Sequence, residues 1–137
     1  MFARFVIAAL LTLTAATPGL AQGGKKNLAT AATPAPDDRA RQWLVLVDDK
    51  NYTQSWNQSG AAFKKRQKAD AWAKQELAKR EPLGAVASRS LKSIDLSRNT
   101  VAVIRYDTVF AHKAAAVETV TLAFENGSWV VTDYSIG

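Results

Sequence analysis

The sequence VAVIRYDTVF (Val101–Phe110) is rich in β-branched and aromatic residues and predicts a β-strand. Three more strands are predicted around it, at Val86–Leu96, Val117–Phe124 and Trp129–Ile136. The turns between the strands are short, and the last of them, Asn126-Gly127, suits a tight hairpin because both residues accept positive φ. Short connections join antiparallel neighbours, so the four strands are expected to form an antiparallel meander.

Ahead of the strands, apolar residues recur at helical spacing. The pattern predicts one helix from Asp37 to Asp49, a short one holding Tyr52 and Trp56, another piece around Phe63, and an amphipathic helix that begins at Ala69 and is closed by Pro82 and Gly84. A meander must cover one of its faces, and these helices are the only elements that can do so. The predicted fold is therefore α+β, a single domain over residues 37–137 in which N-terminal helices pack on a curved four-stranded antiparallel sheet.

The first 36 residues have a different composition. Arg4, an apolar run from Val6 to Ala16 and small residues up to Ala21 predict a signal peptide over residues 1–21, cleaved after Ala21. The alternative is a membrane anchor, but the run is short of the roughly 20 apolar residues that a spanning helix needs, and no later segment is apolar enough to cross a bilayer. Residues 22–36 are rich in small residues, glycine and proline and predict a flexible linker. We expect a periplasmic or secreted protein.

Composition excludes several classes of protein. The chain has 137 residues, 47% of them apolar and 22% charged, which is typical of a globular domain. The absence of cysteine excludes disulfide scaffolds and thiolate metal sites, and a single histidine excludes any site with two imidazoles. No phosphate-binding loop, zinc-protease or serine-hydrolase motif occurs. We expect no metal, no cofactor and no nucleic-acid partner.

Basic residues gather in one segment. Residues 64–80 hold seven basic and two acidic side chains, and its densest part is Lys64, Lys65, Arg66 and Lys68. Such a patch attracts anionic lipids or polymers, although lysines on short helices more often form an ordinary solvated face. Both interpretations stay open.

Two carboxylates interrupt apolar strands. Alternation places Arg105 and Asp107 on the same face as Val101, Val103 and Val109, and places Glu118 with Val120, Leu122 and Phe124. A carboxylate on an apolar face is costly unless it is paired or protonated.

In a functional interpretation, Glu118 or Asp107 is a general base in a dry pocket and Tyr106 or Tyr134 is the hydrogen-bond donor. The structural alternative pairs Glu118 with Arg89 or Arg105 on a neighbouring strand, or places it at a solvated strand end. Arg89, Arg105, Tyr106 and Tyr134 are the candidate binding residues.

The four tryptophans admit a similar pair of interpretations. Trp43, Trp56, Trp72 and Trp129 could line an aromatic pocket for a sugar or lipid, but each lies at the core-facing period of its element, so core packing is the default.

Four segments of the sequence resemble an exported bacterial family known as domain of unknown function 4019. They are Trp43-Leu44-Val45-Leu46-Val47-Asp48, Arg80-Glu81-Pro82-Leu83-Gly84, Tyr106-Asp107-Thr108-Val109-Phe110 and Gly127-Ser128-Trp129-Val130-Val131. More distantly, Asp48, Tyr52 and Leu83-Gly84 resemble the nuclear transport factor 2-like (cystatin-like) superfamily, which implies a cone-like roll. The family implies no activity, and the superfold hosts enzymes as well as binding modules. The superfamily also implies that the free face of the sheet, with Val101, Val103 and Val109, packs against a second copy.

Three hypotheses follow. The leading one is a non-enzymatic module that binds a small ligand or an envelope protein. The second is a cofactor-free enzyme with Glu118 or Asp107 as base. The third is association of the basic segment at residues 64–80 with anionic envelope components.

Overall fold

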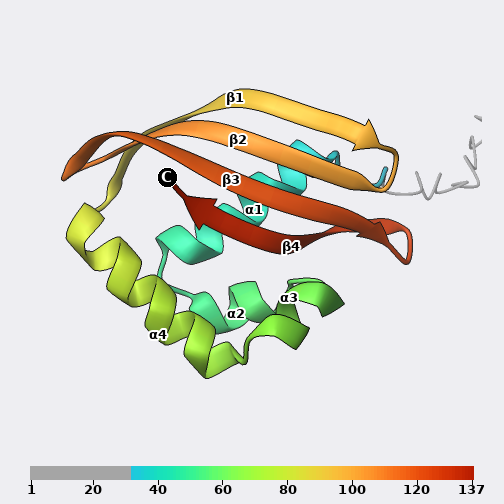
Figure 1. The fold of residues 1–137 in the computed structure, drawn as a ribbon, viewed down its shortest axis with the longest axis horizontal. Coiled ribbons are helices and arrows are strands. Elements are labelled where there is room, and N and C mark those ends of the chain that lie inside the picture. Colours follow the sequence, from blue (N-terminus) through green and yellow to red (C-terminus); the bar gives the residue numbers. More distant parts are fainter. Residues whose placement is uncertain (1–31) are drawn as a thin grey trace, which may run out of the picture. The chain divides into compact units, whose positions relative to one another are not determined.

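Four antiparallel strands form the predicted meander. The computed structural model describes residues 32–137, and in it the strands are neighbours in chain order, β1-β2-β3-β4 (Figure 1). They are β1 (Val86–Arg98), β2 (Val101–Phe110), β3 (Lys113–Glu125) and β4 (Ser128–Ile136). β3 begins four residues before the predicted start, because Lys113 already pairs with Phe110 and leaves only Ala111 and His112 in the turn.

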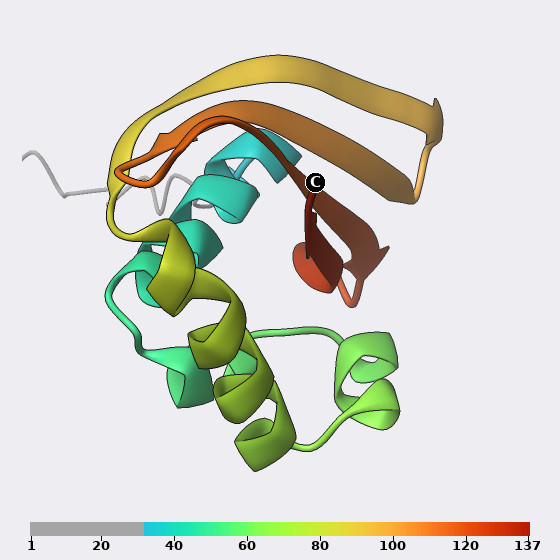
Figure 2. The ribbon, with the colours of Figure 1, turned by 60° about the vertical axis from the view of Figure 1, so that its left-hand side comes forward.

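The helices precede the strands and lie on one side of the sheet. They are α1 (Pro36–Asp48), α2 (Tyr52–Asn57), α3 (Ala61–Arg66), α4 (Ala69–Arg80) and the 3₁₀ turn η1 (Glu81–Leu83). Figure 2 shows the sheet curving over α1, while α3 lies against β4 and α2 and α4 pack on each other further from the strands. Gly84 has a φ of 74°, which lets the chain leave η1 and enter β1. The α+β prediction is confirmed.

The core is aromatic. Trp43, Phe63, Trp72 and Tyr134 stack with ring centroids 4.9 to 6.2 Å apart. Aliphatic residues of α1 and of the three strands β2, β3 and β4 surround them, namely Ala40, Leu44, Val47, Ala102, Ile104, Val120, Leu122 and Val131. Trp56 and Trp129 lie at the margin and are partly buried. The tryptophans thus pack in or against the core, as their spacing predicted.

The two faces of β2 differ in burial. Ala102, Ile104, Tyr106, Thr108 and Phe110 are buried beneath the sheet, whereas Val101, Val103, Arg105, Asp107 and Val109 face the other way and are half-buried or exposed. The second set shares a face, as predicted, and that face is the outer one. Glu118 lies on the inner face of β3 with the buried Val120 and Leu122.

The N-terminal predictions fall mostly on residues without a described structure. The predicted signal peptide at residues 1–21 lies outside the described residues, as does the predicted linker up to residue 31. Residues 32–35 have no regular structure and Pro36 is the first residue of α1. Within residues 32–137, no helix has the length and apolar character needed to cross a membrane.

Candidate functional site

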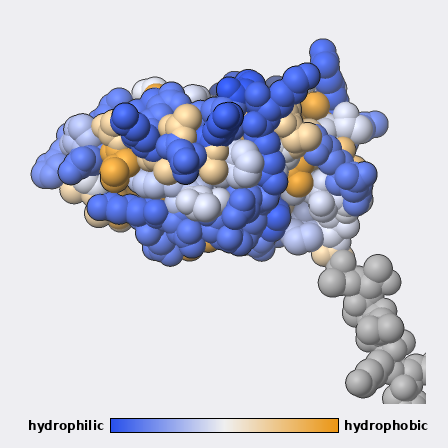
Figure 3. Space-filling view, turned by 90° about the horizontal axis from the view of Figure 1, so that it is seen from below, coloured by the Kyte–Doolittle hydropathy of each residue, from blue (hydrophilic) through white to orange (hydrophobic). Residues whose placement is uncertain are grey.

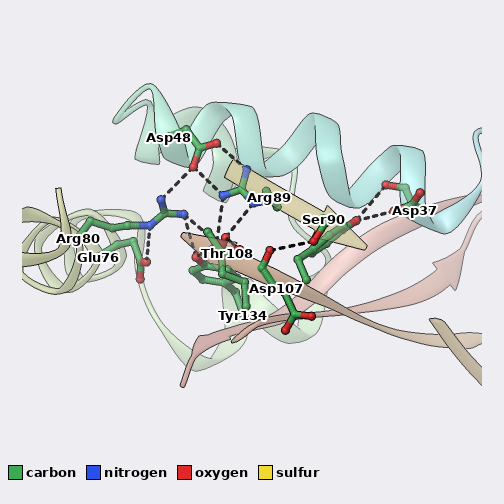
Figure 4. A network of polar contacts seen from close by, with 11 residues as sticks. Asp37, Asp48, Glu76, Arg80, Arg89, Ser90, Asp107, Thr108 and Tyr134 are labelled. Carbon is green, nitrogen blue, oxygen red and sulfur yellow. Dashed lines mark hydrogen bonds and ion pairs between the residues drawn. The ribbon is translucent and has the colours of Figure 1, made fainter. Parts of the chain in front are cut away.

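Four charged side chains meet between the helices and the sheet. Asp48 ends α1, Arg80 ends α4, Arg89 belongs to β1 and Glu118 to β3. We call these residues the ion quartet. Figure 4 shows Arg80 and Arg89 reaching Asp48 from two different elements. The quartet therefore ties both long helices to the sheet.

Short ion pairs join the four members of the ion quartet. Arg89 binds Glu118 through Nε to Oε1 at 2.8 Å, and binds Asp48 through Nη1 to Oδ2 at 2.7 Å. Arg80 binds Asp48 through Nη1 to Oδ1 at 2.9 Å and Glu118 through Nη2 to Oε2 at 3.2 Å. Two guanidinium groups thus balance two carboxylates, which is what the burial of charge requires. Burial alone would lower the pKa of Arg89, but its hydrogen bonds to Asp48 and Glu118 and their charges outweigh burial and raise that pKa.

Two hydroxyl groups complete the bonding of Glu118. Thr108 Oγ1 donates to Oε1 at 2.6 Å, and the hydroxyl of Tyr134 donates to Oε2. Burial raises the pKa of Tyr134, and the negative charge of Glu118 raises it further, so the phenol keeps its proton. Glu118 has no exposed surface and accepts hydrogen bonds at both oxygens. The carboxylate has its lone pairs committed to protein donors, and a general base needs one that substrate can reach.

The structure brings some of the candidate residues together and separates others. Glu118, Arg89 and Tyr134 meet in the quartet. Asp107 is exposed on the outer face, where Lys92 Nζ donates to it at 3.1 Å. Arg105 is exposed on the same face. Between Glu118's two alternative partners, the structure therefore selects Arg89.

Tyr106 is buried apart from the quartet. Its hydroxyl donates to Asp37 Oδ1 at 2.6 Å, and the guanidinium of Arg41 lies 5.4 Å from its ring centroid. Burial, followed by the bond to Asp37, raises the pKa of Tyr106. These contacts fix the first turn of α1 to β2.

Neither Arg80 nor Asp48 is among the site residues that the sequence predicted. Arg80 belongs to the basic segment at residues 64–80, yet it is only 7% exposed and joins the ion quartet from the end of α4. Glu76 lies four residues before Arg80 and so on the same helix face, but this spacing does not say whether that face is buried.

The basic residues of α3 are partly committed within the fold. Lys64 Nζ donates to the carbonyl of Asn57 at 2.7 Å and lies over the ring of Trp56, and Arg66 binds the carbonyl of Thr132 and the carboxylate of Asp133. Lys65 and Lys68 are exposed. Seen from the helix side, the surface is mainly hydrophilic with small separate hydrophobic patches (Figure 3).

A hollow of about 480 Å³ adjoins the quartet, where α1, α2, α4 and the start of β1 meet. It is lined by Val47, Asp48, Lys50, Tyr52, Leu77, Arg80, Glu81, Gly84, Ala85 and Val86. We call it the Tyr52 hollow. Its walls combine aliphatic side chains with charged ones, two of which, Asp48 and Arg80, belong to the ion quartet.

Three buried polar groups on α2 and α4 have no hydrogen-bond partner among the described residues. They are the hydroxyl of Tyr52, both carboxylate oxygens of Glu76 and Nε of Arg80. Glu76 Oε1 lies 3.6 Å from Arg80 Nε, beyond hydrogen-bonding distance, and Glu76 is 1% exposed. Burial raises the pKa of Glu76 against the opposing effect of Arg80, and burial also raises the pKa of Tyr52. Buried polar groups are almost always paired, so these three groups are exceptions within the described residues.

Glu76 predicts a pH dependence of stability. The charged and titratable groups around it are Arg80 and Lys79 on α4, Tyr52 on α2, Glu118 on β3 and Tyr134 on β4. A carboxyl whose pKa is raised on folding stabilises the protein when protonated, and this contribution is lost as pH rises from about 4.5 through the folded pKa. We expect Glu76→Gln to be more stable than the parent protein at pH 7 by roughly 1 kcal/mol, with the difference vanishing near pH 4.

Urea unfolding followed by tryptophan fluorescence at several pH values measures this effect. Glu81→Gln is the control, because Glu81 is exposed on the same helix end. A variant less stable than the parent at pH 7, with a deficit that grows as pH rises, would show instead that ionised Glu76 stabilises the fold through Arg80.

Comparison with known proteins agrees with this architecture. A crystal structure described as a "Putative NTF2-like transpeptidase" from Campylobacter jejuni is similar in fold, with a TM-score of 0.51 at 19% sequence identity. The similarity covers 72% of this chain and 97% of that one, and shows an NTF2-like fold. A search of curated proteins gives no match.

The family is matched directly by sequence. Residues 39–134 match the family described as "Protein of unknown function (DUF4019)". This range includes the whole ion quartet and the Tyr52 hollow, and it confirms the resemblance seen in the sequence. The chain belongs to the DUF4019 family.

Proposed function

We propose that this protein is an exported, non-enzymatic module that binds a small amphipathic ligand in the Tyr52 hollow. The observation that carries the proposal is the Tyr52 hollow itself, in which aliphatic side chains adjoin charged groups of the ion quartet. Ligand sites in proteins are mostly apolar concavities with a few polar groups that fix orientation, and about 480 Å³ lies within their usual size range. Val47, Leu77 and Val86 would contact the apolar part of the ligand.

The bonding of the two candidate bases supports binding over catalysis. Glu118 is bound by Arg80, Arg89, Thr108 and Tyr134, and Asp107 is solvated beside Lys92. A general base needs a lone pair that the substrate can reach inside a dry pocket, whereas the oxygens of Glu118 are occupied by protein donors and Asp107 lies on the exposed outer face. Neither environment suits proton abstraction from carbon.

The residues of this chain do not supply the groups that the transpeptidase activity named for the structural neighbour usually needs. Acyl transfer through a covalent intermediate needs an activated nucleophile, most often cysteine or serine beside a histidine. This sequence has no cysteine, and its one histidine, His112, is exposed in the turn between β2 and β3.

The proposal predicts saturable binding of simple amphiphiles. We expect at least one of hexylamine, hexanoate and 1-hexanol, titrated into the ¹⁵N-labelled protein, to shift the amide signals around the Tyr52 hollow with saturation in the micromolar to millimolar range. Leu77→Lys places a charge in the aliphatic wall and is expected to weaken binding about tenfold or more.

The matched control is Val45→Lys, because Val45 is an exposed aliphatic residue of α1 that does not line the hollow. It should leave the affinity unchanged. If none of the three probes saturates, or if Leu77→Lys binds as well as Val45→Lys, the Tyr52 hollow is not the ligand site.

Export is supported by the sequence before the domain. The signal-like residues 1–21 and the small residues at the expected cleavage site support secretion to the periplasm. Intact-mass measurement of the protein isolated from a periplasmic fraction should give a chain that begins at Gln22. Retention of residues 1–21 in that fraction would contradict cleavage.

The outer face of the sheet supports association with a second copy. Val101 and Val103 are only half-buried there, Val109 is 37% exposed, and no helix of residues 32–137 covers them. Light scattering coupled to size exclusion should report a dimer that Val103→Lys dissociates, whereas Val45→Lys should leave it intact. A monomeric parent protein at tens of micromolar would contradict this pairing.

A further inference from the structure

We propose that two copies of this protein pair edge to edge through strand β1, in an antiparallel register centred on Ile94. The inference goes beyond the proposed ligand site and uses a different surface from the outer face of the sheet. It follows from the free edge of β1, from the apolar residues exposed along that strand and from the order of its charges.

The two edges of the sheet differ in how they are covered. At the β4 edge, the backbone N–H of Gly60 donates to the carbonyl of Val131 at 2.8 Å, and Arg66 donates to the carbonyl of Thr132. At the opposite edge, β1 pairs only with β2, and no other backbone segment of residues 32–137 pairs with its free side (Figure 1). A 13-residue edge strand with unpaired backbone groups is a template for one more strand.

Apolar side chains are exposed along the central part of β1. Leu91, Ile94 and Leu96 are 41, 42 and 51% exposed. Leu91 pairs with Tyr106 and Ile94 with Ile104, so both lie on the inner face of the sheet, and alternation turns Leu96 to the same side. The helices pack beneath the other strands and leave this stripe uncovered. Exposed apolar stripes of this kind mark interaction sites.

Two charges of the same segment lie on the outer face. Lys92 Nζ donates to Asp107 on that face at 3.1 Å, and Asp95 pairs with Val103 of the same face. The register shift at Lys92 lets Lys92 and Asp95 share a face although they are three residues apart. The segment therefore presents apolar side chains on one face and one charge of each sign on the other.

A two-fold axis through Ile94 makes this segment complementary to itself. Antiparallel pairing about that axis places Ile94 against Ile94 of the second copy, and Leu91 of each copy beside Leu96 of the other. On the outer face, the same axis brings Lys92 of each copy to Asp95 of the other. The register shifts lie at Lys92 and after Asp95, on both sides of Ile94, so the irregular parts of the two strands meet each other.

This self-complementarity makes a second copy the occupant of the free edge. An axis through Lys92 or through Asp95 would set two like charges opposite each other, which destabilises a strand pair. The axis through Ile94 instead opposes apolar residues and charges of opposite sign. Edge pairing leaves the outer face of both sheets open, so it is compatible with association through that face. The interface joins one strand of each copy, and such small interfaces give weak association.

Single cysteines test the register, because the chain has no cysteine of its own. All variants carry Val109→Lys, which charges the outer face opposite Ser88, away from the axis, and removes association through that face. Leu91→Cys and Leu96→Cys proteins, mixed and oxidised in air, are expected to form the mixed disulfide about tenfold faster than either forms its own.

Ile94→Cys gives a second test, since it lies on the axis. It should link to itself about tenfold faster than Leu77→Cys, the matched control on α4, because cysteines that face each other across a strand pair are close enough for a disulfide. Leu77 is exposed to the same extent, 41% against 42% for Ile94, and lies outside the sheet. The amide spectrum of each reduced variant shows that the fold is retained.

Exchange of charge tests the outer contact. Lys92→Glu sets two negative charges together across the axis and should slow the Ile94→Cys link about threefold. Adding Asp95→Lys restores opposite charges and should restore the rate. Asp107→Asn is the control, because it removes the partner of Lys92 within its own chain and should not slow the link.

The outcomes separate the register from the edge contact itself. Equal rates for the mixed and the like pairs of Leu91→Cys and Leu96→Cys would overturn the axis at Ile94. An Ile94→Cys link no faster than that of Leu77→Cys would overturn edge pairing altogether. A rate that Asp95→Lys does not restore would show that Lys92 and Asp95 do not meet, and would also overturn the register. None of these results bears on ligand binding in the Tyr52 hollow.

Discussion

Replacing Glu118 with glutamine is expected to lower the free energy of unfolding by about 3 to 5 kcal/mol, the usual cost of removing one partner from a buried ion pair. The carboxylate is fully buried and holds Arg80, Arg89, Thr108 and Tyr134 at its two oxygens. Glutamine has almost the same shape but no charge, and one of its two polar atoms donates where donors already converge. Asp48 would then face two buried guanidinium groups alone.

Urea unfolding at pH 7, followed by tryptophan fluorescence, gives the difference in stability. Glu125→Gln makes the same chemical change near the end of the same strand, outside the quartet, and should cost less than about 0.5 kcal/mol. Thr108→Val removes only one donor to Glu118 and should cost about 1 kcal/mol, which gives a milder test of the same network. A loss below about 1 kcal/mol in Glu118→Gln would show that the quartet contributes little to the fold.

The partner of Glu118 illustrates what alternation in a sequence can and cannot specify. Period two correctly grouped Arg105 with Val101 and Val103 on β2. It did not say which group faces the helices, because the opposite set, with Ile104 and Phe110, is just as apolar. Only the packing of α1 distinguishes the two faces, so the choice between Arg89 and Arg105 needed the assembled structure.

Strand β1 departs from alternation for a local reason. The sequence predicted Val86–Leu96, and the strand runs to Arg98 with irregular pairing to β2 between Leu91 and Ser93 and again after Asp95. Each irregularity shifts the register, so a single period cannot describe the whole strand. Leu91, Ile94 and Leu96 are exposed by 41 to 51% on this strand, which lies at the edge of the sheet and pairs only with β2.

Arg80 shows the limit of local charge as a predictor. Within residues 64–80 it is one basic residue among seven, and nothing in its immediate neighbours separates it from Lys79, which is exposed. Its burial depends on Asp48 and Glu118, which lie 32 and 38 residues away in sequence. The quartet is therefore a tertiary feature, and its residues become a site only when α1, α4 and the sheet are packed together.

Trp43→Ala is expected to lower the free energy of unfolding by about 3 to 5 kcal/mol, the usual cost of truncating a buried tryptophan. Trp43 is 2% exposed, and its ring lies within 6.0 Å of those of Phe63, Trp72 and Tyr134. Its Nε1 donates to the carbonyl of Ser55 at 2.9 Å and to Ser59 Oγ at 3.0 Å. The variant would lose ring contacts with three elements and leave a cavity at the centre of the core.

Trp43→Phe separates the two contributions, because it keeps a ring in the core and removes the donor. The carbonyl of Ser55 still accepts from Ser59 Oγ at 2.8 Å, so this variant should cost only about 1 to 2 kcal/mol. Trp129→Phe, at the margin of the core, should cost less than Trp43→Phe in the same urea titration. If Trp43→Phe were as destabilising as Trp43→Ala, the hydrogen bonds to α2 would dominate over packing.

Because Trp43 contacts Tyr134, which binds Glu118, Trp43→Ala combined with Glu118→Gln should lose less stability than the sum of the two single changes.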